Sequence, residues 1–397
     1  MSYRILYHHR IRADDGQAVH VRELIGALRA AGHEVLECAL VPKANGQEAH
    51  ANGVSGSGGT SFWQRLRLPR VAVETMEVLY NRQGRAMVRA AAREFRPDFI
   101  YERHALHCRV GLDVSRELEV PLLLEVNSPM VDEMRTLGLL RMPGRAAATE
   151  FDVLQGADRV LAVTRVLGDI LVERGAREES VRIVPNGAVP ARYSSEVHGH
   201  RREIREKMGI PEDAFALGFI GYMRPWHRLD LVLELMTRPA FAAMHLVLIG
   251  RGPALEGLLE TASNQGLDGR VHSLGELAPD VLPQHVCAFD GALIPAINAY
   301  ASPLKLFDSL AASVPTLAPD QPNLREVVTD GETGLLFDTG NIDDLAEKLG
   351  ALVADPAVGR RLGQAGRQSL LDNGWTWEGN AMRVADYARE LGAKESA

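Results

Sequence analysis

One short segment has residue types and spacing that could bind an anion and a diol; it reads Ala301-Ser302-Pro303-Leu304-Lys305-Leu306-Phe307-Asp308. Ser302 is a preferred N-cap residue and Pro303 suits the first helical position, so unpaired backbone N–H groups at this helix start would bind a phosphate. Lys305 and Asp308 are three residues apart and share one face of the helix. The order of cation and carboxylate matches a diphosphate followed by a ribose. The segment therefore predicts a nucleotide diphosphate site, the alternative being an ordinary capped surface helix.

The composition indicates two globular domains and excludes some functions. The chain has 397 residues and is 46% hydrophobic, which is too long for one ordinary core and apolar enough for two. The formal net charge of -8 argues against a nucleic-acid-binding protein. Cys38, Cys108 and Cys287 have no metal-like spacing, so we expect a reducing compartment and no structural zinc. Without a signal-peptide profile or an apolar run of spanning length, we expect a cytoplasmic protein whose membrane association is at most peripheral.

Strand-like and helix-like segments alternate along most of the chain. The expected strands cover residues 5–8, 35–40, 99–101, 121–126, 160–163 and 181–184, then 216–220, 246–249, 271–274, 291–294 and 316–318. Helices are expected at residues 18–30, 71–95 and 375–391. This alternation predicts the α/β class, with two doubly wound parallel sheets of the Rossmann type and ligands beyond the carboxyl ends of the strands, in a cleft between the domains.

The predicted domain limits follow from these elements. An N-terminal, acceptor-binding domain covers residues 1–188, and a C-terminal, nucleotide-sugar-binding domain covers residues 189–374. Residues 375–397 form a C-terminal helix that packs back towards the N-terminal domain. The polar stretch 193–207 is interpreted as the crossing into the second domain. Asn186 and Gly187 are expected to serve the hinge, where domain closure would exclude water from the donor.

A polar loop and a basic, aromatic segment follow the second expected strand. Residues 45–61 are rich in Gly, Ser, Asn and Ala, and we expect a mobile loop there. The next segment begins with Phe62 and Trp63 and ends with Arg70, and mixes aromatic, aliphatic and basic residues. It predicts peripheral contact with an anionic membrane leaflet that carries a lipid-linked acceptor. The alternative is a solvated loop with a buried tryptophan.

Several motifs, taken together in their order and spacing, resemble the retaining glycosyltransferases of family four, which have two Rossmann-like domains (the GT-B architecture). The motifs are Gly32-His33-Glu34-Val35, Leu124-Glu125-Val126-Asn127-Ser128-Pro129, Gly156-Ala157-Asp158-Arg159-Val160, Val184-Pro185-Asn186-Gly187, Phe219-Ile220-Gly221, Ile249-Gly250-Arg251-Gly252-Pro253, the segment 302–308 and Asp330-Gly331-Glu332-Thr333-Gly334-Leu335-Leu336-Phe337. The resemblance covers nearly the whole chain. It implies transfer of a sugar from a nucleotide diphosphate to an acceptor, with retention at the anomeric carbon.

The resemblance also implies roles for residues of the C-terminal domain. Asp308 stands where the family normally has a Glu that holds the ribose hydroxyls. Tyr300 stands where the family pattern has an acidic residue near the donor sugar, and Tyr222 stands where it usually has an Arg. Arg224 and Arg228 are then the candidates, beside Lys305, for balancing the negative charge that develops on the leaving diphosphate.

The glycine-rich turn after the expected strand 246–249 has a second interpretation. It resembles the start of a dinucleotide fingerprint, but Leu255 replaces the third glycine, so NAD binding is not expected. We interpret Gly250 as part of a strand-to-helix turn that lines the donor pocket.

Polar residues of the N-terminal domain supply the remaining candidates. The family's catalytic-site histidine corresponds to Arg103, with His104 one residue later, and both are catalytic candidates. Gly16 could let the first loop approach a phosphate closely, the alternative being a plain turn glycine. Glu125 and Asn127 end a buried strand, where polar groups are costly unless bonded, which favours acceptor binding or a satisfied structural hydrogen bond.

The predicted reaction needs no cofactor. No D-x-D motif occurs, so we expect metal-independent transfer from a UDP- or GDP-sugar to a glycan, a lipid-linked or a small-molecule acceptor, as in polysaccharide biosynthesis. Two alternatives remain. One is a sugar-nucleotide epimerase of the same architecture. The other is a catalytically degenerate, partner-binding relative, which is suggested by Tyr300, Tyr222 and Asp308.

Overall fold

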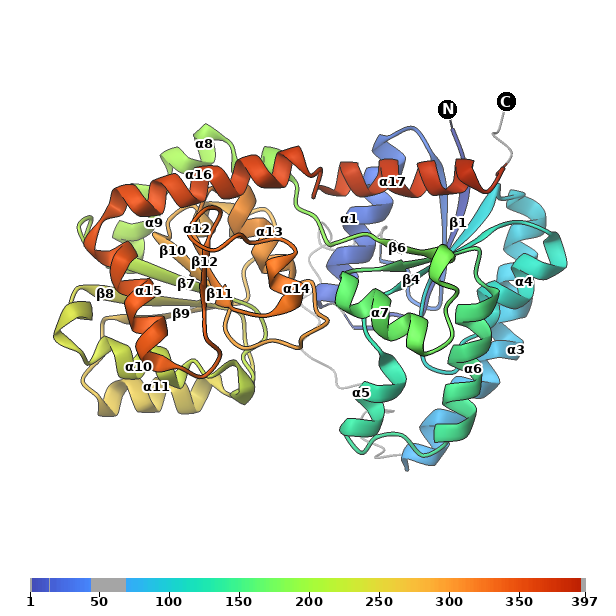
Figure 1. The fold of residues 1–397 in the computed structure, drawn as a ribbon, viewed down its shortest axis with the longest axis horizontal. Helices are drawn as coiled ribbons and strands as arrows, with labels where there is room; N and C mark the ends of the chain where they lie inside the picture. Colours follow the sequence, from blue (N-terminus) through green and yellow to red (C-terminus); the bar gives the residue numbers. More distant parts are fainter. Residues whose placement is uncertain (1, 14, 44–68, 394–397) are drawn as a thin grey trace, which may run out of the picture. The chain divides into compact units, whose positions relative to one another are not determined.

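The chain folds into two compact units, which are described separately. The computed structural model describes residues 2–13, 15–43 and 69–393. Unit 1 comprises Met1–Pro185 and Trp377–Ala397, and unit 2 comprises Asn186–Thr376. The chain therefore enters unit 2 after Pro185 and returns to unit 1 at Trp377 (Figure 1).

Unit 1 is built on a six-stranded parallel sheet in the order β2-β1-β3-β4-β5-β6. Its strands are β1 (Arg4–His9), β2 (Glu34–Ala39), β3 (Phe99–Arg103), β4 (Leu122–Val126), β5 (Arg159–Ala162) and β6 (Val181–Ile183). Strand β1 pairs with β2 on one side and with β3 on the other, in the register His8 to Glu102. The direction of winding therefore reverses between β1 and β3, and such a switch point is where ligands bind in open α/β sheets.

Helices connect these strands and close the unit. They are α1 (Gly16–Ala30), α3 (Arg70–Phe95), α4 (Val110–Leu118), α5 (Met130–Thr136), α6 (Pro143–Gly156), α7 (Arg165–Glu173) and α17 (Trp377–Glu390). Helix α17 lies beside α1, where the rings of Trp377 and His20 meet edge to face with centroids 4.9 Å apart. The last helix of the chain is thus part of the N-terminal unit.

Unit 2 is built on a second six-stranded parallel sheet, in the order β12-β11-β10-β7-β8-β9. Its strands are β7 (Phe215–Ile220), β8 (Met244–Ile249), β9 (Val271–Gly275), β10 (Gly291–Leu293), β11 (Thr316–Pro319) and β12 (Leu335–Phe337). Its helices are α8 (Ser195–Gly199), α9 (Arg201–Met208), α10 (Asp230–Met236), α11 (Leu255–Asn264), α12 (Leu282–Val286), α13 (Leu304–Ala311), α14 (Pro322–Arg325), α15 (Ile342–Ala354) and α16 (Pro356–Asp372). The switch point lies between β7 and β10.

The core of unit 2 shows why this sheet is covered on both faces. All six residues of β8 are buried. Leu246 and Leu248 belong to one apolar cluster, whereas Val247 and Ile249 belong to another. Because successive side chains of a strand point to opposite faces, these two clusters lie on opposite sides of the sheet. The prediction of doubly wound parallel sheets with helices on both faces is confirmed.

The interpretation of residues 193–207 as a crossing is wrong. Tyr193 is the last residue of a short 3-10 helix (Pro190–Tyr193). The residues after it form α8 and most of α9, and all of them belong to unit 2. The polar composition suggested an exposed connection, but one of these polar residues is buried: Arg205 of α9 donates a hydrogen bond of 2.8 Å to Asp290. Strand β12 was also not predicted as a strand.

Candidate functional site

The switch point of unit 2 brings Lys305 over the end of β7. Lys305 lies in the first turn of α13, and its Nζ is 4.1 Å from the ring centroid of Phe219, which is on β7. Gly221 follows that strand, and a Cβ atom at this position would be 3.1 Å from the same Nζ. The amine therefore lies at the carboxyl end of the sheet, where a ligand of a doubly wound domain is expected.

Among the described residues, the amine of Lys305 has no carboxylate partner. Burial lowers the pKa of Lys305 to about 7. The ring of His227 lies 5.4 Å from that of Phe219, and burial, followed by the charges of Lys305 and Arg224, lowers its pKa to about 4. Within the described part of the chain, no acidic side chain forms an ion pair with Lys305. An amine held in this way is stabilised as a cation when an anion arrives.

Hydrogen bonds to Asn186 hold the loop before α13, and Ser302 of this loop does not cap the helix. The expectation that Ser302 caps the helix is wrong, because the helix begins at Leu304 and Pro303 occupies the N-cap position without a side-chain cap. The hydroxyl of Ser302 accepts a hydrogen bond of 3.2 Å from the backbone N–H of Asn186, and the Asn186 side chain donates to the Ser302 carbonyl at 2.5 Å. Ser302 therefore forms its hydrogen bonds with Asn186, the first residue of unit 2.

Asp308 lies one turn beyond Lys305 on α13 and is half-buried. Its Oδ1 accepts a hydrogen bond of 2.9 Å from the hydroxyl of Tyr193. Burial and the nearby Asp308 charge raise the pKa of Tyr193 well above its ordinary value. Tyr193 was missed by sequence reasoning. The tyrosine keeps its proton and orients the carboxylate, as a positioning partner would.

Glycines let the two loops beside Lys305 approach each other. Gly250 follows β8 with a φ of +120°, and a Cβ there would fall on the carbonyl oxygen of Gly221. Gly252 has a φ of +154°, and its Cβ would fall on the backbone of Met223. Only glycine adopts these conformations without strain. The turn that contains Gly250 connects β8 to α11, as expected.

The structure distinguishes the two arginine candidates after β7. Arg224 is exposed, and its guanidinium lies 4.6 Å from the ring of Tyr222 and 5.1 Å from that of Trp226. Arg228 instead forms an ion pair with Asp230, with Nη2 to Oδ2 at 3.0 Å. The charge of Arg224 acts on His227 beside Lys305, whereas that of Arg228 is balanced by Asp230.

Tyr300 lies on the loop between β10 and α13. Its hydroxyl accepts a hydrogen bond of 2.9 Å from the side chain of Asn298. The neighbouring carbonyl of Ala301 accepts a bond of 2.7 Å from Asn323. The loop that carries Tyr300 is therefore held on both sides of the position where the family pattern has an acidic residue.

In unit 1 the buried carboxylate of Glu125 organises the ends of β3 and β4. It accepts hydrogen bonds from His20 at 2.9 Å and from Tyr101 at 2.7 Å. It also pairs with Arg103 and accepts from Asn127. Burial alone would raise its pKa, but His20 and Arg103 outweigh this effect and hold the pKa well below its ordinary value. Glu125 is therefore a satisfied charge that fixes Arg103.

A hollow of about 230 Å³ lies at the switch point of unit 1. Arg103 and His104 both line it, together with Gln17 of α1. Gly16 is the first residue of α1, whose start is capped by Asp15 through the N–H of Gln17. Glu125 and Asn127 do not line the hollow but contact Arg103 or its partner.

Two family models match nearly the whole chain. "Glycosyl transferase 4-like domain" matches residues 15–187, and "Glycosyl transferases group 1" matches residues 200–369. The chain belongs to the group 1 glycosyltransferases. The resemblance inferred from the motifs is thereby confirmed.

Curated relatives of this glycosyltransferase are moderately similar. The D-inositol 3-phosphate glycosyltransferase of Nocardia farcinica is 29% identical over 67% of this chain, and that of Rhodococcus jostii is 30% identical over 60%. The alignments span 61% and 54% of those two proteins. An alpha-monoglucosyldiacylglycerol synthase of Streptococcus pneumoniae is 25% identical over 74% of this chain and 68% of its own length.

Solved structures show the same fold. Anabaena Alr3699/HepE, in complex with UDP and glucose, has a TM-score of 0.73 at 16% identity, covering 98% of this chain and 100% of that chain. Sucrose-phosphate synthase of Thermosynechococcus elongatus has a TM-score of 0.74 at 19% identity, covering 98% and 99%. At such identities the likeness establishes the fold alone.

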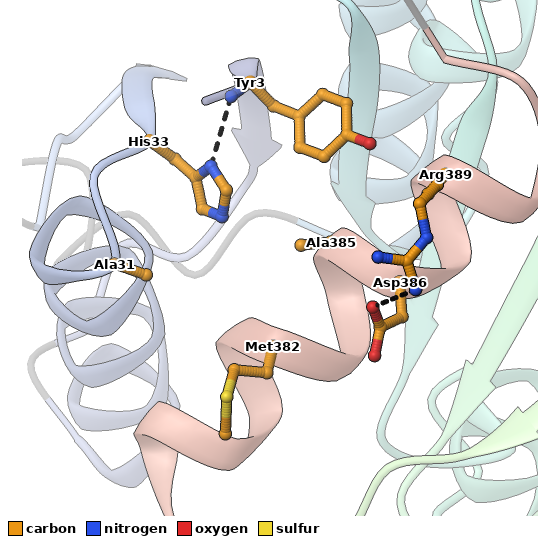
Figure 2. A pocket seen from close by; sticks show the side chains of 7 residues that line it. All are labelled: Tyr3, Ala31, His33, Met382, Ala385, Asp386 and Arg389. Atoms are coloured by element: carbon orange, nitrogen blue, oxygen red, sulfur yellow. Dashed lines mark hydrogen bonds and ion pairs between the residues drawn. The ribbon is translucent and has the colours of Figure 1, made fainter. Parts of the chain in front are cut away.

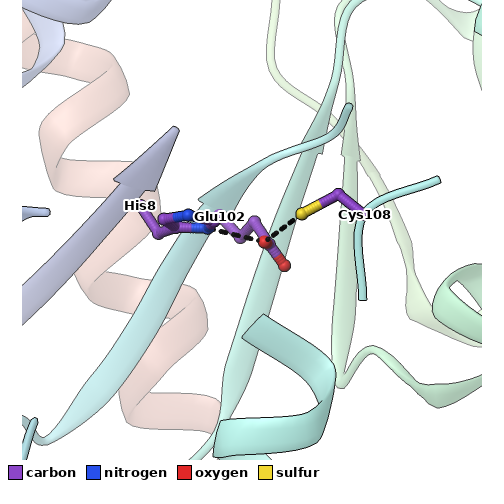
Figure 3. A group of neighbouring side chains, drawn as sticks. All are labelled: His8, Glu102 and Cys108. Atoms are coloured by element: carbon purple, nitrogen blue, oxygen red, sulfur yellow. Dashed lines mark hydrogen bonds and ion pairs between the residues drawn. The ribbon is translucent and has the colours of Figure 1, made fainter. Parts of the chain in front are cut away.

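A second polar cluster of this glycosyltransferase lies inside unit 1 (Figure 3). Glu102 accepts from His8 at 2.7 Å and from the thiol of Cys108 at 3.4 Å, and the backbone N–H of Gly111 also donates to it at 2.9 Å. Burial raises the pKa of Cys108 well above its ordinary value, so this residue stays a thiol. The donors already occupy the carboxylate, and the cluster joins β1 to β3 in the core.

A further hollow of unit 1 contains none of the predicted site residues (Figure 2). It lies between α17 and the start of β1, where the backbone N–H of Tyr3 donates to the ring of His33 at 3.1 Å. Arg389 of α17 points into it and forms an ion pair of 2.6 Å with Asp386. These groups are engaged with one another.

The segment that predicted membrane contact falls mostly outside the described residues. Only Pro69 and Arg70 of the segment beginning at Phe62 are described, and the Arg70 side chain donates to the carbonyl of Leu139 at 3.0 Å. The loop expected at residues 45–61 also lies outside them. Among the described helices, none combines the length and the apolar character needed to cross a membrane.

Proposed function

We propose that this chain transfers a sugar from a nucleoside diphosphate sugar to an acceptor, with retention at the anomeric carbon and without a metal. The observation that carries the proposal is the amine of Lys305 at the switch point of unit 2, which has a lowered pKa and no ion-pair partner in the described chain. Asp308 lies one turn further along the same helix. A cation and then a carboxylate suit a diphosphate followed by a ribose diol.

The comparisons support the same class of donor. The Anabaena structures are complexes with UDP, with UDP and glucose, and with UDP-glucose. The curated relatives are named as a glycosyltransferase and a synthase of a glucosylated lipid, which does not favour the epimerase alternative. We therefore expect a UDP- or GDP-sugar donor and a sugar, lipid-linked or small-molecule acceptor.

The chain's own charges would drive the departure of the diphosphate. Negative charge develops on the leaving phosphate oxygens, and preorganised cations stabilise it most when they are desolvated. The amine of the half-buried Lys305 lies over the ring of Phe219, and the charge of Arg224 acts on the neighbouring His227. Asp308, oriented by Tyr193, would hold the ribose.

Asp308→Ala is expected to remove nucleotide binding. The measurement is the unfolding temperature of the wild type and of the variant with UDP, GDP, ADP and CDP. A ligand at a hundred times its Kd adds about 2.7 kcal/mol, which shifts the unfolding temperature by several degrees. We expect a shift with one nucleotide in the wild type and none in the variant. The variant also leaves the Tyr193 hydroxyl unpaired, so the comparison uses the shift on adding nucleotide, not the absolute temperature.

Asp280→Ala is the matched control, because Asp280 is exposed and lies outside α13, so this variant removes the same charge at another position of unit 2. It should keep the wild-type shift. Absence of a shift with every nucleotide and with a panel of nucleotide sugars would contradict the proposed donor site.

The product is expected to keep the anomeric configuration of the donor. One-dimensional proton NMR of the product gives the configuration from the coupling of the anomeric proton, and the glycosidic bond preserves that configuration. An inverted product would overturn retention while leaving transferase activity intact. The same donor incubated without acceptor should stay unchanged, whereas an epimerase would convert it.

UDP affinity is expected to fall about tenfold for each pH unit above 7. In the free protein the pKa of Lys305 is lowered to about 7, so the amine is mostly neutral at pH 8. A bound diphosphate raises this pKa, so Lys305 takes up a proton when the nucleotide binds. Because the proton concentration falls as the pH rises, binding becomes weaker. The phosphate's own second pKa is about 6, so its charge no longer changes in this range. Calorimetric titration in two buffers with different ionisation heats measures the proton uptake directly.

Lys305→Arg is the control for the pH dependence, because its guanidinium stays protonated throughout this range. The variant should bind with little pH dependence above 7. Proton release by the wild type, or an unchanged affinity between pH 7 and 9, would contradict the assignment of Lys305 to the diphosphate.

Contact of the segment from Phe62 to Arg70 with a membrane stays a prediction.

A further inference from the structure

The hollow at the switch point of unit 1 is surrounded by basic groups. It lies beyond the carboxyl ends of β1 and β3 and beside the first turns of α1 and α5. The residues that line it are Arg10, Ile11, Arg12, Ala13, Gln17, Arg103, His104, Ala105 and Met130. Three arginines and a histidine stand among them, and none of the described lining residues is acidic. In a chain with a formal net charge of -8, this is a local reversal of sign.

The arginines are held in different ways. The guanidinium of Arg10 lies 4.6 Å from the ring centroid of Tyr80 and donates to the carbonyl of Leu106 at 2.9 Å. Neither contact neutralises its charge. Arg12 is exposed, and its backbone carbonyl accepts a bond of 2.9 Å from the amine of Lys43, which brings a further cation close. Arg103 is the one lining arginine that pairs with a carboxylate in the described chain, that of Glu125.

His104 adds an independent sign of a missing ligand. Its exposed fraction is 9%, and neither ring nitrogen has a hydrogen-bond partner in the described chain. Its Nε2 is 3.6 Å from a carboxylate oxygen of Glu150, which is too long for a hydrogen bond. A buried imidazole without hydrogen bonds is costly, because its polar atoms have lost water without replacement. A ligand in the hollow that His104 lines would supply a partner for this imidazole.

We propose that this hollow binds an anionic group of the acceptor, a phosphate or a carboxylate. The inference rests on the proposed function, because it assigns the charge of the acceptor in that reaction. Arg10 and Arg12 would contact the anion, and His104 would contact an adjacent oxygen of the same molecule. Ile11, Ala105 and Met130 would face its carbon skeleton. Guanidinium groups match both anions, so the shared chemistry is an oxyanion.

The test compares three six-carbon probes that differ in charge. Glucose, glucuronate and glucose 6-phosphate are titrated calorimetrically into protein saturated with UDP, so that the nucleotide site is already filled. We expect glucose 6-phosphate or glucuronate to bind at least tenfold more tightly than glucose. Arg12→Gln and Arg10→Gln should each reduce that preference about tenfold or more, as expected for the loss of a charge-assisted hydrogen bond. Two variants are used so that misfolding of one does not decide the result.

Arg145→Gln is the matched control. Arg145 is an exposed arginine on α6 and does not line the hollow, so its variant should bind the probes as the wild type does.

A second arm presents vesicles of phosphatidylglycerol or of phosphatidylcholine to the UDP-saturated protein. Binding of glucose 6-phosphate or glucuronate indicates a soluble anionic acceptor. Binding of phosphatidylglycerol vesicles alone, lost in Arg12→Gln, indicates an anionic lipid headgroup in the same hollow.

The proposal is overturned if none of these anions binds more tightly than its neutral counterpart. It is also overturned if Arg12→Gln and Arg10→Gln bind them as the wild type does. UDP binding without any anion preference would contradict this inference alone. Failure to bind any nucleotide would instead contradict the proposed function.

Discussion

Lys305→Met is expected to abolish nucleotide binding and, at the same time, to stabilise the ligand-free protein. The variant removes the cation from the diphosphate, and loss of a desolvated charge-assisted contact should weaken UDP at least a hundredfold. Methionine keeps the contact with the Phe219 ring, since a thioether packs well against an aromatic side chain. The shift in unfolding temperature that UDP produces in the wild type should therefore disappear.

The stabilisation follows from the lowered pKa. The amine has a pKa of about 7 in the folded protein and an ordinary value of 10.5 in the unfolded chain. The unfolded chain therefore binds more protons between these values, and the cost of burying the cation is fully present below pH 7 and shrinks as the pH rises towards 10.5. Below pH 7 we expect Lys305→Met to raise the free energy of unfolding by about 1 to 3 kcal/mol.

Both effects are measured in one series of thermal unfolding experiments at pH 6.5 and pH 9, with and without UDP. Lys207→Met is the control, because Lys207 is exposed on α9 and pairs with Glu203. It should change neither the stability nor the nucleotide shift appreciably. A Lys305→Met variant that still responds to UDP as the wild type does would disprove the role of this amine. A variant less stable than the wild type at pH 6.5 would disprove the buried-cation argument.

Glu125→Ala is expected to destabilise unit 1 by about 3 to 5 kcal/mol. The substitution leaves Arg103 and His20 buried without their carboxylate and removes the acceptor of the Tyr101 hydroxyl. Because the pKa of Glu125 is lowered by folding, its contribution is present above its ordinary pKa and is lost as the pH falls below it. The deficit of the variant should therefore be complete at pH 7 and smaller in acid. Urea unfolding at several pH values measures it.

Glu117→Ala is the contrasting control. Glu117 likewise pairs with several cationic groups, Arg85, Arg89 and Arg93, but on the surface of unit 1, where the pairs are exposed to solvent. Its removal should have little effect, because exposed ion pairs gain little from association. Equal effects of the two substitutions would contradict the view that burial gives Glu125 its importance. Glu125→Gln should lie between the two, since it keeps an acceptor oxygen.

Local patterns were sufficient to predict most strands of the fold, but only a few of its helices. Short apolar runs such as residues 246–249 are typical of strands buried on both faces, and the structure confirms a strand there as part of β8. The order of strands could not be predicted in this way. The placement of β10 beside β7 depends on crossover connections, which leave no local trace in the sequence. Strand β12, with three residues, is too short to give a periodic signal.

The same limit applies to the candidate site. The three-residue spacing of Lys305 and Asp308 is a local feature, and the sequence was enough to find it. The partners Tyr193 and Asn186 are separated from Asp308 and Ser302 by 115 and 116 residues, and no helical or strand period connects such positions. The N-cap assignment of Ser302 failed for this reason, because the competing partner of its hydroxyl is distant in the chain.

The return of the chain to unit 1 at Trp377 sets an order for synthesis on the ribosome. Unit 2 is one uninterrupted stretch, Asn186–Thr376, and Ala188 bonds to the Trp375 carbonyl near its other end at 3.2 Å. Every residue of unit 2 has therefore been translated before α17 begins. The ring of His20 on α1 therefore gains its contact with Trp377 only after α17 has been translated. The unit whose translation starts before that of unit 2 is thus completed after it, and the side of α1 that α17 covers stays uncovered until the last helix has been made.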